Sequence, residues 1–497
     1  MKLDRSTLTR PWRAALAPLM AALVLAGCAT ATPEAPSFQA PAQFKEQAAA
    51  PAEGQWTQAK PAEAQPRGEW WRAFNDPVLD TLVARADASN NSIQVAAARL
   101  AEARALARST DADRSPQLGL GGGASRQRGL DRNQSTTPST LITAGLDFSY
   151  ELDLFGRLSK ASDAARLDAE SRAGLLQSTR LLVQAETAQT YLSLRALDDE
   201  RQLVRETVEA YRDTLRLTQQ RHQAGDIAEL DVARVETEMA STESEALTLD
   251  RRRAELEHAL AVLSGEAASS FEMKPDKWAT ALPAIPAGVP ATVLTRRPDV
   301  SAAQRSVLAA QARVGVAQAA WFPNIALTGG AGYASTDLGD LFKWSARSWG
   351  IGALLSLPLL DGGRREAGVQ GANAQLDGAL ASYRDQVLTA FKDVEDQLSA
   401  LRILGSQSEV QAKAVASASR ATQLSDARYR NGYVSQLDLL DARRSELRNR
   451  RQALQVRSAQ YQSTVGLIRA LGGGWTDAAA TADAAPATGA NAQVAAR

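Results

Sequence analysis

The sequence contains one internal repeat, whose two copies keep a constant offset of 207 residues. Gly225 and Gly432 form one matching pair (432 − 225) and lie in similar surroundings. The same offset relates Pro116 to Pro323, Gly122-Gly123-Ala124 to Gly329-Gly330-Ala331, Gly145 to Gly352, Gly156-Arg157 to Gly363-Arg364, and Leu230-Asp231 to Leu437-Asp438. Because no gap is needed across strand-like, turn-like and helix-like stretches, the sequence predicts two tandem copies of one unit that build a single fold.

Each half contains a very long helical stretch followed by a shorter returning one. Residues 158 to about 223 contain no proline, and at 1.5 Å per residue they would span roughly 100 Å. Apolar residues recur there at steps of four and three, which is coiled-coil spacing. Gly225 and Gly432 supply the backbone freedom for reversing the chain. Returning helices are therefore expected over about 227–264 and 434–471.

Ahead of the long helix, the first half carries a helical stretch and two alternating stretches. Residues 80–113 have apolar residues near a 3.6-residue spacing and predict a helix that ends before Pro116. The alternating stretches predict β-strands: Leu146 and Phe148 fall on one side, Asp147 and Ser149 on the other. With the matching stretches of the second half, the expected strands span about 116–126, 141–152, 323–333 and 347–358.

These strands are long enough to cross a membrane, since a tilted membrane strand needs about 9–11 residues. Four strands cannot close a barrel, and open sheet edges are excluded from lipid because their N–H and C=O groups would be unpaired. The expected fold is mainly α with a membrane β-barrel: coiled-coil helices plus four transmembrane strands per chain, in a barrel shared by several chains. A soluble β-sandwich face alternates in the same way and is the alternative.

The N-terminus has the order of a secretory signal peptide, with basic residues, a short apolar run and then Leu25-Ala26-Gly27-Cys28. The last four residues resemble the bacterial lipobox, which implies that residues 1–27 are removed and that Cys28 carries a diacylglycerol and an N-acyl chain. Ala29 favours the outer membrane as the destination. A buried structural thiol is the alternative for Cys28. The proline-rich residues 28–68 are expected to form an extended tether, and the alanine-rich residues 473–497 a disordered tail.

Composition excludes several classes of function. The formal net charge is +0 with both signs interspersed, so the basic patch of a nucleic-acid-binding protein is missing. Past the signal peptide, no stretch of 18 apolar residues predicts a transmembrane helix. His222 and His258 are the only histidines, and Gly121-Gly122-Gly123 lacks the lysine of a phosphate-binding loop. We therefore expect no enzyme, no metal and no cofactor other than the lipid.

Several motifs resemble those of outer-membrane efflux lipoproteins of the NodT type, which are related to the TolC channel-tunnels. They are Trp70-Trp71-Arg72-Ala73-Phe74-Asn75-Asp76-Pro77, Glu151-Leu152-Asp153-Leu154-Phe155-Gly156-Arg157, Arg296-Arg297-Pro298-Asp299-Val300 and Ala319-Ala320-Trp321-Phe322-Pro323. The resemblance covers nearly the whole chain from Cys28 to about Leu471. It implies a homotrimer with a shared twelve-stranded barrel and a periplasmic helical tunnel. It also implies a periplasmic adaptor and an inner-membrane pump of the resistance-nodulation-division class.

The second helix reversal resembles the segment that constricts the periplasmic opening in that family. The resemblance points to Leu437, Asp438 and Asp441, and more weakly to Asp231 of the first reversal, as gate residues. Three-fold symmetry would bring copies of each carboxylate together, which raises their pKa and favours bound cations. Helix capping is the alternative for Asp438, because Ser435 precedes it by three residues as in a capping box.

The two helix reversals differ in charge, and this difference suggests an ion pair that holds the gate closed, which we call a latch. In the first, Asp226 with Glu229 is expected to cap the returning helix, and Arg234 stands where the second has Asp441. Asp441 paired with Arg234 or Arg428 could then hold the gate closed. The reversals at Gly225 and Gly432 are the expected adaptor contacts.

The chain is thus expected to comprise a first repeat over 69–265, a connector over 266–297 and a second repeat over 298–472. Its expected function is passive export of drugs or other small molecules as the outer-membrane channel of a tripartite pump. The alternatives are a type I secretion channel for polypeptides and a structural coiled-coil lipoprotein without a pore.

Overall fold

A computed structural model describes residues 41, 43–46, 68–128, 138–283, 285 and 296–473. The chain divides into two compact units. The sheet unit comprises the described parts of residues 101–171 and 303–383, and the helix unit those of residues 38–100, 172–302 and 384–497. Cys28, the expected signal peptide, most of the expected tether and almost all of the expected C-terminal tail lie outside the described residues.

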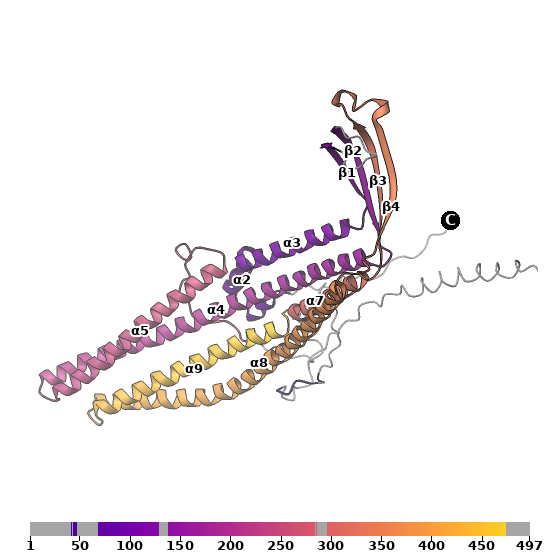
Figure 1. The fold of residues 1–497 in the computed structure, drawn as a ribbon. Helices are drawn as coiled ribbons and strands as arrows, with labels where there is room; N and C mark the ends of the chain where they lie inside the picture. The colour runs from indigo at the N-terminus through magenta and orange to yellow at the C-terminus, as the bar shows by residue number, and fades with distance from the viewer. Residues whose placement is uncertain are drawn as a thin grey trace, which may run out of the picture. The chain divides into compact units, whose positions relative to one another are not determined.

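The sheet unit contains four antiparallel strands that lie side by side in chain order (Figure 1). They are β1 (Gln117–Gln127), β2 (Ser139–Leu152), β3 (Asn324–Ser335) and β4 (Arg347–Ser356). Each bound lies within two residues of the expected one. Two short 3₁₀ turns, η3 (Leu338–Asp340) and η4 (Trp344–Ala346), connect β3 to β4. Proline precedes β1, β2 and β3 at positions 116, 138 and 323, where a residue without an N–H removes no ladder hydrogen bond.

Two helical hairpins account for most of the remaining described residues (Figure 1). The long helices α4 (Arg157–Gln223) and α8 (Arg364–Arg430) have 67 residues each, and the returning helices α5 (Glu229–Leu263) and α9 (Gln436–Ala470) have 35 each. The two long helices begin 207 positions apart (364 − 157), and so do the two returning helices (436 − 229). None of the helices in the described part of the chain has an apolar stretch long enough to cross a bilayer.

The expected helix over 80–113 is wrong in one respect, because Asn90 interrupts it. The chain forms α2 (Pro77–Ser89) and α3 (Asn91–Ala112), with Asn90 in an extended conformation between them. Its carbonyl Oδ1 accepts the amide of Ser92 at 2.9 Å, and its Nδ2 donates to the carbonyl of Leu263 at 2.9 Å. Asn90 therefore satisfies backbone groups of two helices at once, which hydrophobic spacing along one segment does not show.

The core of the helix unit is built on residues that stood out as sequence motifs. Trp70, Trp71 and Phe74 lie in a 3₁₀ helix, η2 (Trp70–Phe74), and are buried. The Trp70 and Trp71 rings meet edge to face at 5.8 Å between centroids. They pack with α2, α4 and the C-terminal end of α9, where Tyr461 is buried. The aromatic motif thus holds the start of the first repeat against the end of the second.

The two repeats end their returning helices in the same way. Gly265 follows α5 with a φ of +73°, and Gly472 follows α9 with a φ of +89°. A Cβ at Gly265 would lie 2.5 Å from the carbonyl oxygen of Ser89, and one at Gly472 would lie 2.8 Å from that of Arg296. These pairs are again 207 positions apart (472 − 265 and 296 − 89). Both positions need glycine for the backbone conformation and for the close approach.

A buried arginine adds ion pairs and a hydrogen bond where the end of α9 meets Arg296, a place we call the second joint. Arg297, the first residue before α7 (Pro298–Ala319), pairs with Asp299 at 2.7 Å and with Asp393 of α8 at 3.0 Å. It also donates to the carbonyl of Ala470 at 3.3 Å, which is the repeat mate of the Leu263 carbonyl that Asn90 holds. Burial acts to lower the pKa of Arg297, but the hydrogen bonds and negative charges of Asp299 and Asp393 together raise it above its ordinary value.

Candidate functional site: an apolar sheet face and two hairpin tips

The four strands stay in register, so their apolar residues share one face of the sheet. Leu118 is opposite Phe148, which is opposite Gly329, which is opposite Ile351. The next row of that face contains Leu120, Leu146, Ala331 and Trp349. We call these two rows the apolar face. Ile351 is 86% exposed and Leu120 is 82% exposed, so within the single chain this apolar face is uncovered.

The opposite face is polar and rich in glycine. Its row between the two apolar rows contains Gly119, Asp147, Gly330 and Gly350. A Cβ at Gly119 would lie 2.5 Å from the Asp147 carboxylate, so glycine there leaves room for the acid on the neighbouring strand. The sheet therefore has one apolar face and one polar, glycine-rich face, as the alternation predicted.

Both edges of this sheet are unpaired in the described chain. β1 pairs only with β2, and β4 pairs only with β3. A sheet edge exposes a row of backbone N–H and C=O groups that is ready to pair with another chain. The described sheet is thus uncovered on its apolar face and unpaired at both edges.

The two hairpin tips turn with the same hydrogen bonds. At the first, Gly225 (φ +83°) donates to the carbonyl of His222 at 2.9 Å, and Asp226 donates to that of Arg221 at 2.9 Å. At the second, Gly432 (φ +77°) donates to the Tyr429 carbonyl at 3.0 Å, and the Tyr433 amide donates to the Arg428 carbonyl at 2.8 Å. No heavy atom lies within 4 Å of a Cβ built at either glycine. Their left-handed conformation alone explains them.

Asp438 is a capping residue in the single chain. Its amide donates to Ser435 Oγ at 3.2 Å, and its carboxylate accepts the Ser435 amide at 3.1 Å and the Ser435 hydroxyl at 2.6 Å. These hydrogen bonds lower the pKa of Asp438. The cap is complete above the ordinary pKa of 3.8 and is lost as the pH falls through the lowered value. The rise expected from three-fold repulsion concerns an assembly and stays a prediction.

Leu437 and Asp441 lie on the uncovered side of α9. Leu437 is 44% exposed, and the Asp441 side chain is 62% exposed. Leu439 and Leu440, between them in sequence, are buried, and Leu440 packs with Tyr211 and other apolar residues of α4 and α5. One turn of helix thus packs two leucines against the neighbouring helices and leaves Leu437 and Asp441 exposed.

The cap expected at the first tip is wrong. The residue before α5 is Ala228, which makes no side-chain capping hydrogen bond. Asp231 instead pairs with Arg234 at 3.4 Å on the same helix, and its carbonyl accepts Gln436 Nε2 at 3.0 Å. Asp226 lies in the turn, three residues before the helix begins. The sequence pattern set the helix start too early.

The expected latch pairs also differ in the single chain. Asp441 pairs with Arg444 at 3.2 Å, not with Arg234 or Arg428. Arg444 in turn binds Glu238 of α5 through its Nε at 2.8 Å. The carboxylate at the second tip is therefore linked to the first hairpin, but through an arginine on its own helix.

Sequence reasoning missed the residues that join the two hairpins. Arg443 donates to the Ala210 carbonyl at 2.6 Å and to Thr214 Oγ1 at 2.5 Å, both on α4. Arg451 pairs with Glu200 at 2.7 Å. The guanidinium of Arg221 lies 4.9 Å from the Tyr429 ring centroid. Single basic residues on long polar helices carry no signal of which opposite helix they will meet.

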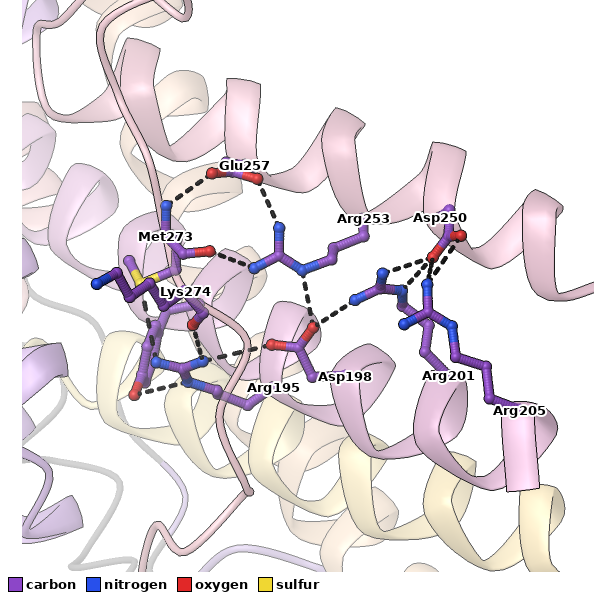
Figure 2. A network of polar contacts seen from close by, with 10 residues as sticks. Arg195, Asp198, Arg201, Arg205, Asp250, Arg253, Glu257, Met273 and Lys274 are labelled. Atoms are coloured by element: carbon purple, nitrogen blue, oxygen red, sulfur yellow. Dashed lines mark hydrogen bonds and ion pairs between the residues drawn. The ribbon is translucent and has the colours of Figure 1, made fainter. Parts of the chain in front are cut away.

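A buried carboxylate, Asp198 of α4, joins the two helices of the first hairpin, α4 and α5 (Figure 2). Its side chain is only 3% exposed and pairs with Arg195 at 3.3 Å, Arg201 at 3.1 Å and Arg253 of α5 at 2.8 Å. Three arginines around one acid leave an excess of positive charge, which is offset by Asp250, paired with Arg201 at 2.5 Å, and by Glu257, paired with Arg253 at 2.6 Å.

The same network holds the connector between the repeats (Figure 2). Arg253 donates to the Met273 carbonyl, and Arg195 donates to the Lys274 carbonyl at 3.0 Å. Glu257 accepts the Met273 amide at 2.6 Å. Arg195 also donates to Tyr191 Oη at 3.1 Å, and burial raises the pKa of Tyr191 to about 12. The network thus joins α4, α5 and the connector.

A sequence profile of the outer membrane efflux protein family matches residues 82–266 and 289–473. The chain belongs to this family. The two matches again begin 207 positions apart (289 − 82). Members of the family are outer-membrane efflux channels, which are not enzymes, and this chain is accordingly an outer-membrane efflux channel protein.

Individual relatives cover nearly the whole chain. The cation efflux system protein CusC of Escherichia coli O6:H1 is 30% identical over 468 residues, which is 93% of this chain and 98% of CusC. The antibiotic efflux pump outer membrane protein ArpC of Pseudomonas putida is 33% identical over 468 residues, 91% of this chain and 94% of ArpC. The solved structure of the outer-membrane channel OprN matches with a TM-score of 0.80 and 31% identity over 89% of this chain and 99% of that one.

Proposed function

We propose that this chain is the outer-membrane channel of a tripartite efflux pump and passively conducts small molecules to the exterior. The observation that carries the proposal is the sheet with an apolar face, a polar face and two unpaired edges. Three copies would supply twelve strands and close all edges, which a membrane barrel requires. The long helical hairpins would then form a periplasmic tunnel in the homotrimer.

The partners follow from this arrangement. A periplasmic adaptor would contact the tips at Gly225 and Gly432 and connect the channel to an inner-membrane pump of the resistance-nodulation-division class. The relatives are named for efflux of cations and of antibiotics, so the channel architecture accommodates different cargo. The pump would therefore select the substrate. The double profile match at an offset of 207 residues supports an origin by duplication.

We place the periplasmic gate at the second tip. Leu437 and Asp441 are exposed on the side of α9 away from the packed leucines, where three copies could meet around one axis. Asp438 would contribute its charge while it caps α9. At the first tip, Asp231 and Arg234 occupy the repeat positions of Asp438 and Asp441, and they form an ion pair. Arg428 stays a candidate latch that would pair with Asp441 and hold the gate closed. A ring of carboxylates would bind cations, and the leucines would resist wetting.

Single-channel conductance in planar bilayers tests the function and the gate together. The purified protein should conduct, and Asp441→Ala with Asp438→Ala should raise the closed-state conductance and remove block by divalent cations. Asp213→Ala is the matched control, because Asp213 is an exposed acid on α4 that pairs with Arg216 of its own helix. Absence of conductance would rule out the channel, whereas unchanged conductance in the double variant would rule out only the gate.

We also propose that Cys28 is acylated and that the lipid is an auxiliary anchor. Cys28→Ser should abolish incorporation of labelled palmitate. Because the sheet would supply the main anchor, variant protein that reaches the outer membrane should keep part of its transport in a drug-susceptibility assay. Labelling that survives the substitution would contradict the assignment of Cys28.

A further inference from the structure

A short segment before the first repeat lies against α8 of the second. Phe44 is 4% exposed, so this segment is anchored by a buried ring. The amides of Lys45 and Glu46 donate to the Glu395 carboxylate at 2.7 Å and 2.9 Å. The Glu46 carboxylate, whose side chain is 22% exposed, pairs with Arg402 at 2.7 Å. We call residues 43–46 the docking segment, and Glu395 with Arg402 its seat.

The contact has the geometry of specific recognition. The two oxygens of Glu395 accept two consecutive backbone amides, one each, which requires the backbone there to be turned toward the helix. Hydrogen bonds to an ionised acceptor are stronger than those between neutral groups. Arg402 lies seven residues after Glu395, two turns along one side of α8, and holds the side chain of the same segment. Backbone and side chain are thus bound at once.

The first repeat uses the matching position in a similar way. Arg402 is the repeat mate of Arg195 (402 − 195 is 207), and Arg195 holds the connector through the Lys274 carbonyl. Each long helix therefore uses an arginine at the same repeat position to hold the irregular segment that precedes a repeat. In the first repeat the junction is buried around Asp198, whereas in the second it is partly exposed, with Arg402 at 51%.

We infer that α8 carries a dedicated seat for the docking segment of its own chain, which fixes the N-terminal tether to the second repeat. The inference does not depend on acylation of Cys28 or on conductance. It assigns to Glu395 and Arg402 the role of binding a chain segment, and it makes the tether a part of the folded protein at residues 43–46.

Proteolysis with a lysine-specific protease tests the seat, since Lys45 is exposed but its backbone is held. In the full-length detergent-solubilised protein, Glu395→Gln should raise the rate of cleavage after Lys45 about tenfold, because the amide group can replace only one of the two acceptors. Glu409→Gln, an exposed glutamate on the same helix, is the matched control and should leave the rate unchanged. Equal rates in all three proteins would overturn the inference.

Exchange of the charges of Glu46 and Arg402 distinguishes loss of this ion pair from a general folding defect. Glu46→Arg and Arg402→Glu should each speed cleavage after Lys45, and the double exchange should restore protection by re-forming the pair. Helix content by circular dichroism should not differ among the variants. Cleavage in the double variant that is as fast as in the single ones would refute the pairing.

Cross-linking identifies which chain supplies the docking segment. With cysteines at 46 and 402, a short bis-maleimide should give a cross-link that leaves the denatured protein at monomer mass and joins the two positions by peptide mapping. Cysteines at 46 and at Lys413, three turns along α8, are the control and should not react. A product of dimer mass would show that a neighbouring copy supplies the segment, and it would overturn the assignment to the same chain.

Discussion

At the scale of single residues, buried charge is the feature with the largest consequences for stability. Asp198 is almost inaccessible and is the common partner of three arginines from two helices. The desolvation penalty of such ions is offset only while every partner is present, so removal of one charge leaves others buried and unpaired. Asp198 is therefore the carboxylate on which the arginines of α4 and α5 converge at this junction.

We predict that Asp198→Asn destabilises the protein by about 3 kcal/mol or more, because it removes the charge but keeps the size of the side chain. Thermal unfolding of the purified protein measures the effect. Asp163→Asn is the control: Asp163 pairs with Arg166 at 3.0 Å on the surface of α4, where an ion pair contributes about 0–1 kcal/mol. Equal shifts in the two variants would show that Asp198 has no special role.

At the scale of helices and strands, the repeat reuses the same solutions for chain reversal and helix termination. The glycines that end α5 and α9 differ from those at the hairpin tips in one respect. A Cβ at Gly472 would come within 2.8 Å of the Arg296 carbonyl, whereas at Gly432 it would meet nothing within 4 Å. Both have positive φ. Conformation and close packing can thus be separated experimentally.

We expect Gly432→Ala to cost about 1–2 kcal/mol of unfolding free energy, from the left-handed conformation alone. Gly472→Ala should cost clearly more, because the backbone of the second joint must also move apart. Denaturant unfolding of both variants, followed by tryptophan fluorescence, makes the comparison. If Gly432→Ala were the more destabilising, close packing at Gly472 would not be the reason for glycine there.

At the scale of the whole molecule, the exposed apolar face of the sheet is the feature that bears on membrane insertion. In the proposed trimer, lipid would cover the apolar face and neighbouring copies would pair with the open edges. The helix unit, by contrast, has its own core of aromatic and aliphatic residues. We therefore expect changes on the apolar face to affect membrane insertion more than the packing of the helices.

Ile351→Arg should reduce insertion into the outer membrane, since an arginine facing lipid costs about 2–4 kcal/mol near the bilayer midplane. Ser348→Arg, on the opposite face of the same strand, should insert normally. Membrane fractionation, together with the mobility of unheated samples in electrophoresis as a measure of trimer formation, provides the readout. Similar loss in both variants would contradict the assignment of the faces.

The sequence by itself determined the elements and the family. The constant offset, the alternation in the strands and the proline-free helices are local patterns, and the observed strands lie within two residues of those expected. The long and returning helices likewise begin and end within two residues of the expected bounds. Such features follow from periodicity and from glycine and proline, which act on a few neighbouring residues.

The tertiary structure decided everything that depends on a distant partner. Asn90 breaks a helix because the end of α5 supplies a carbonyl for it, and Asp441 pairs with Arg444 because Glu238 of another helix holds that arginine. Asp198 looks like any acid on a polar helix until α5 and the connector surround it. Charged side chains choose partners by position in three dimensions, and a single sequence does not contain those positions.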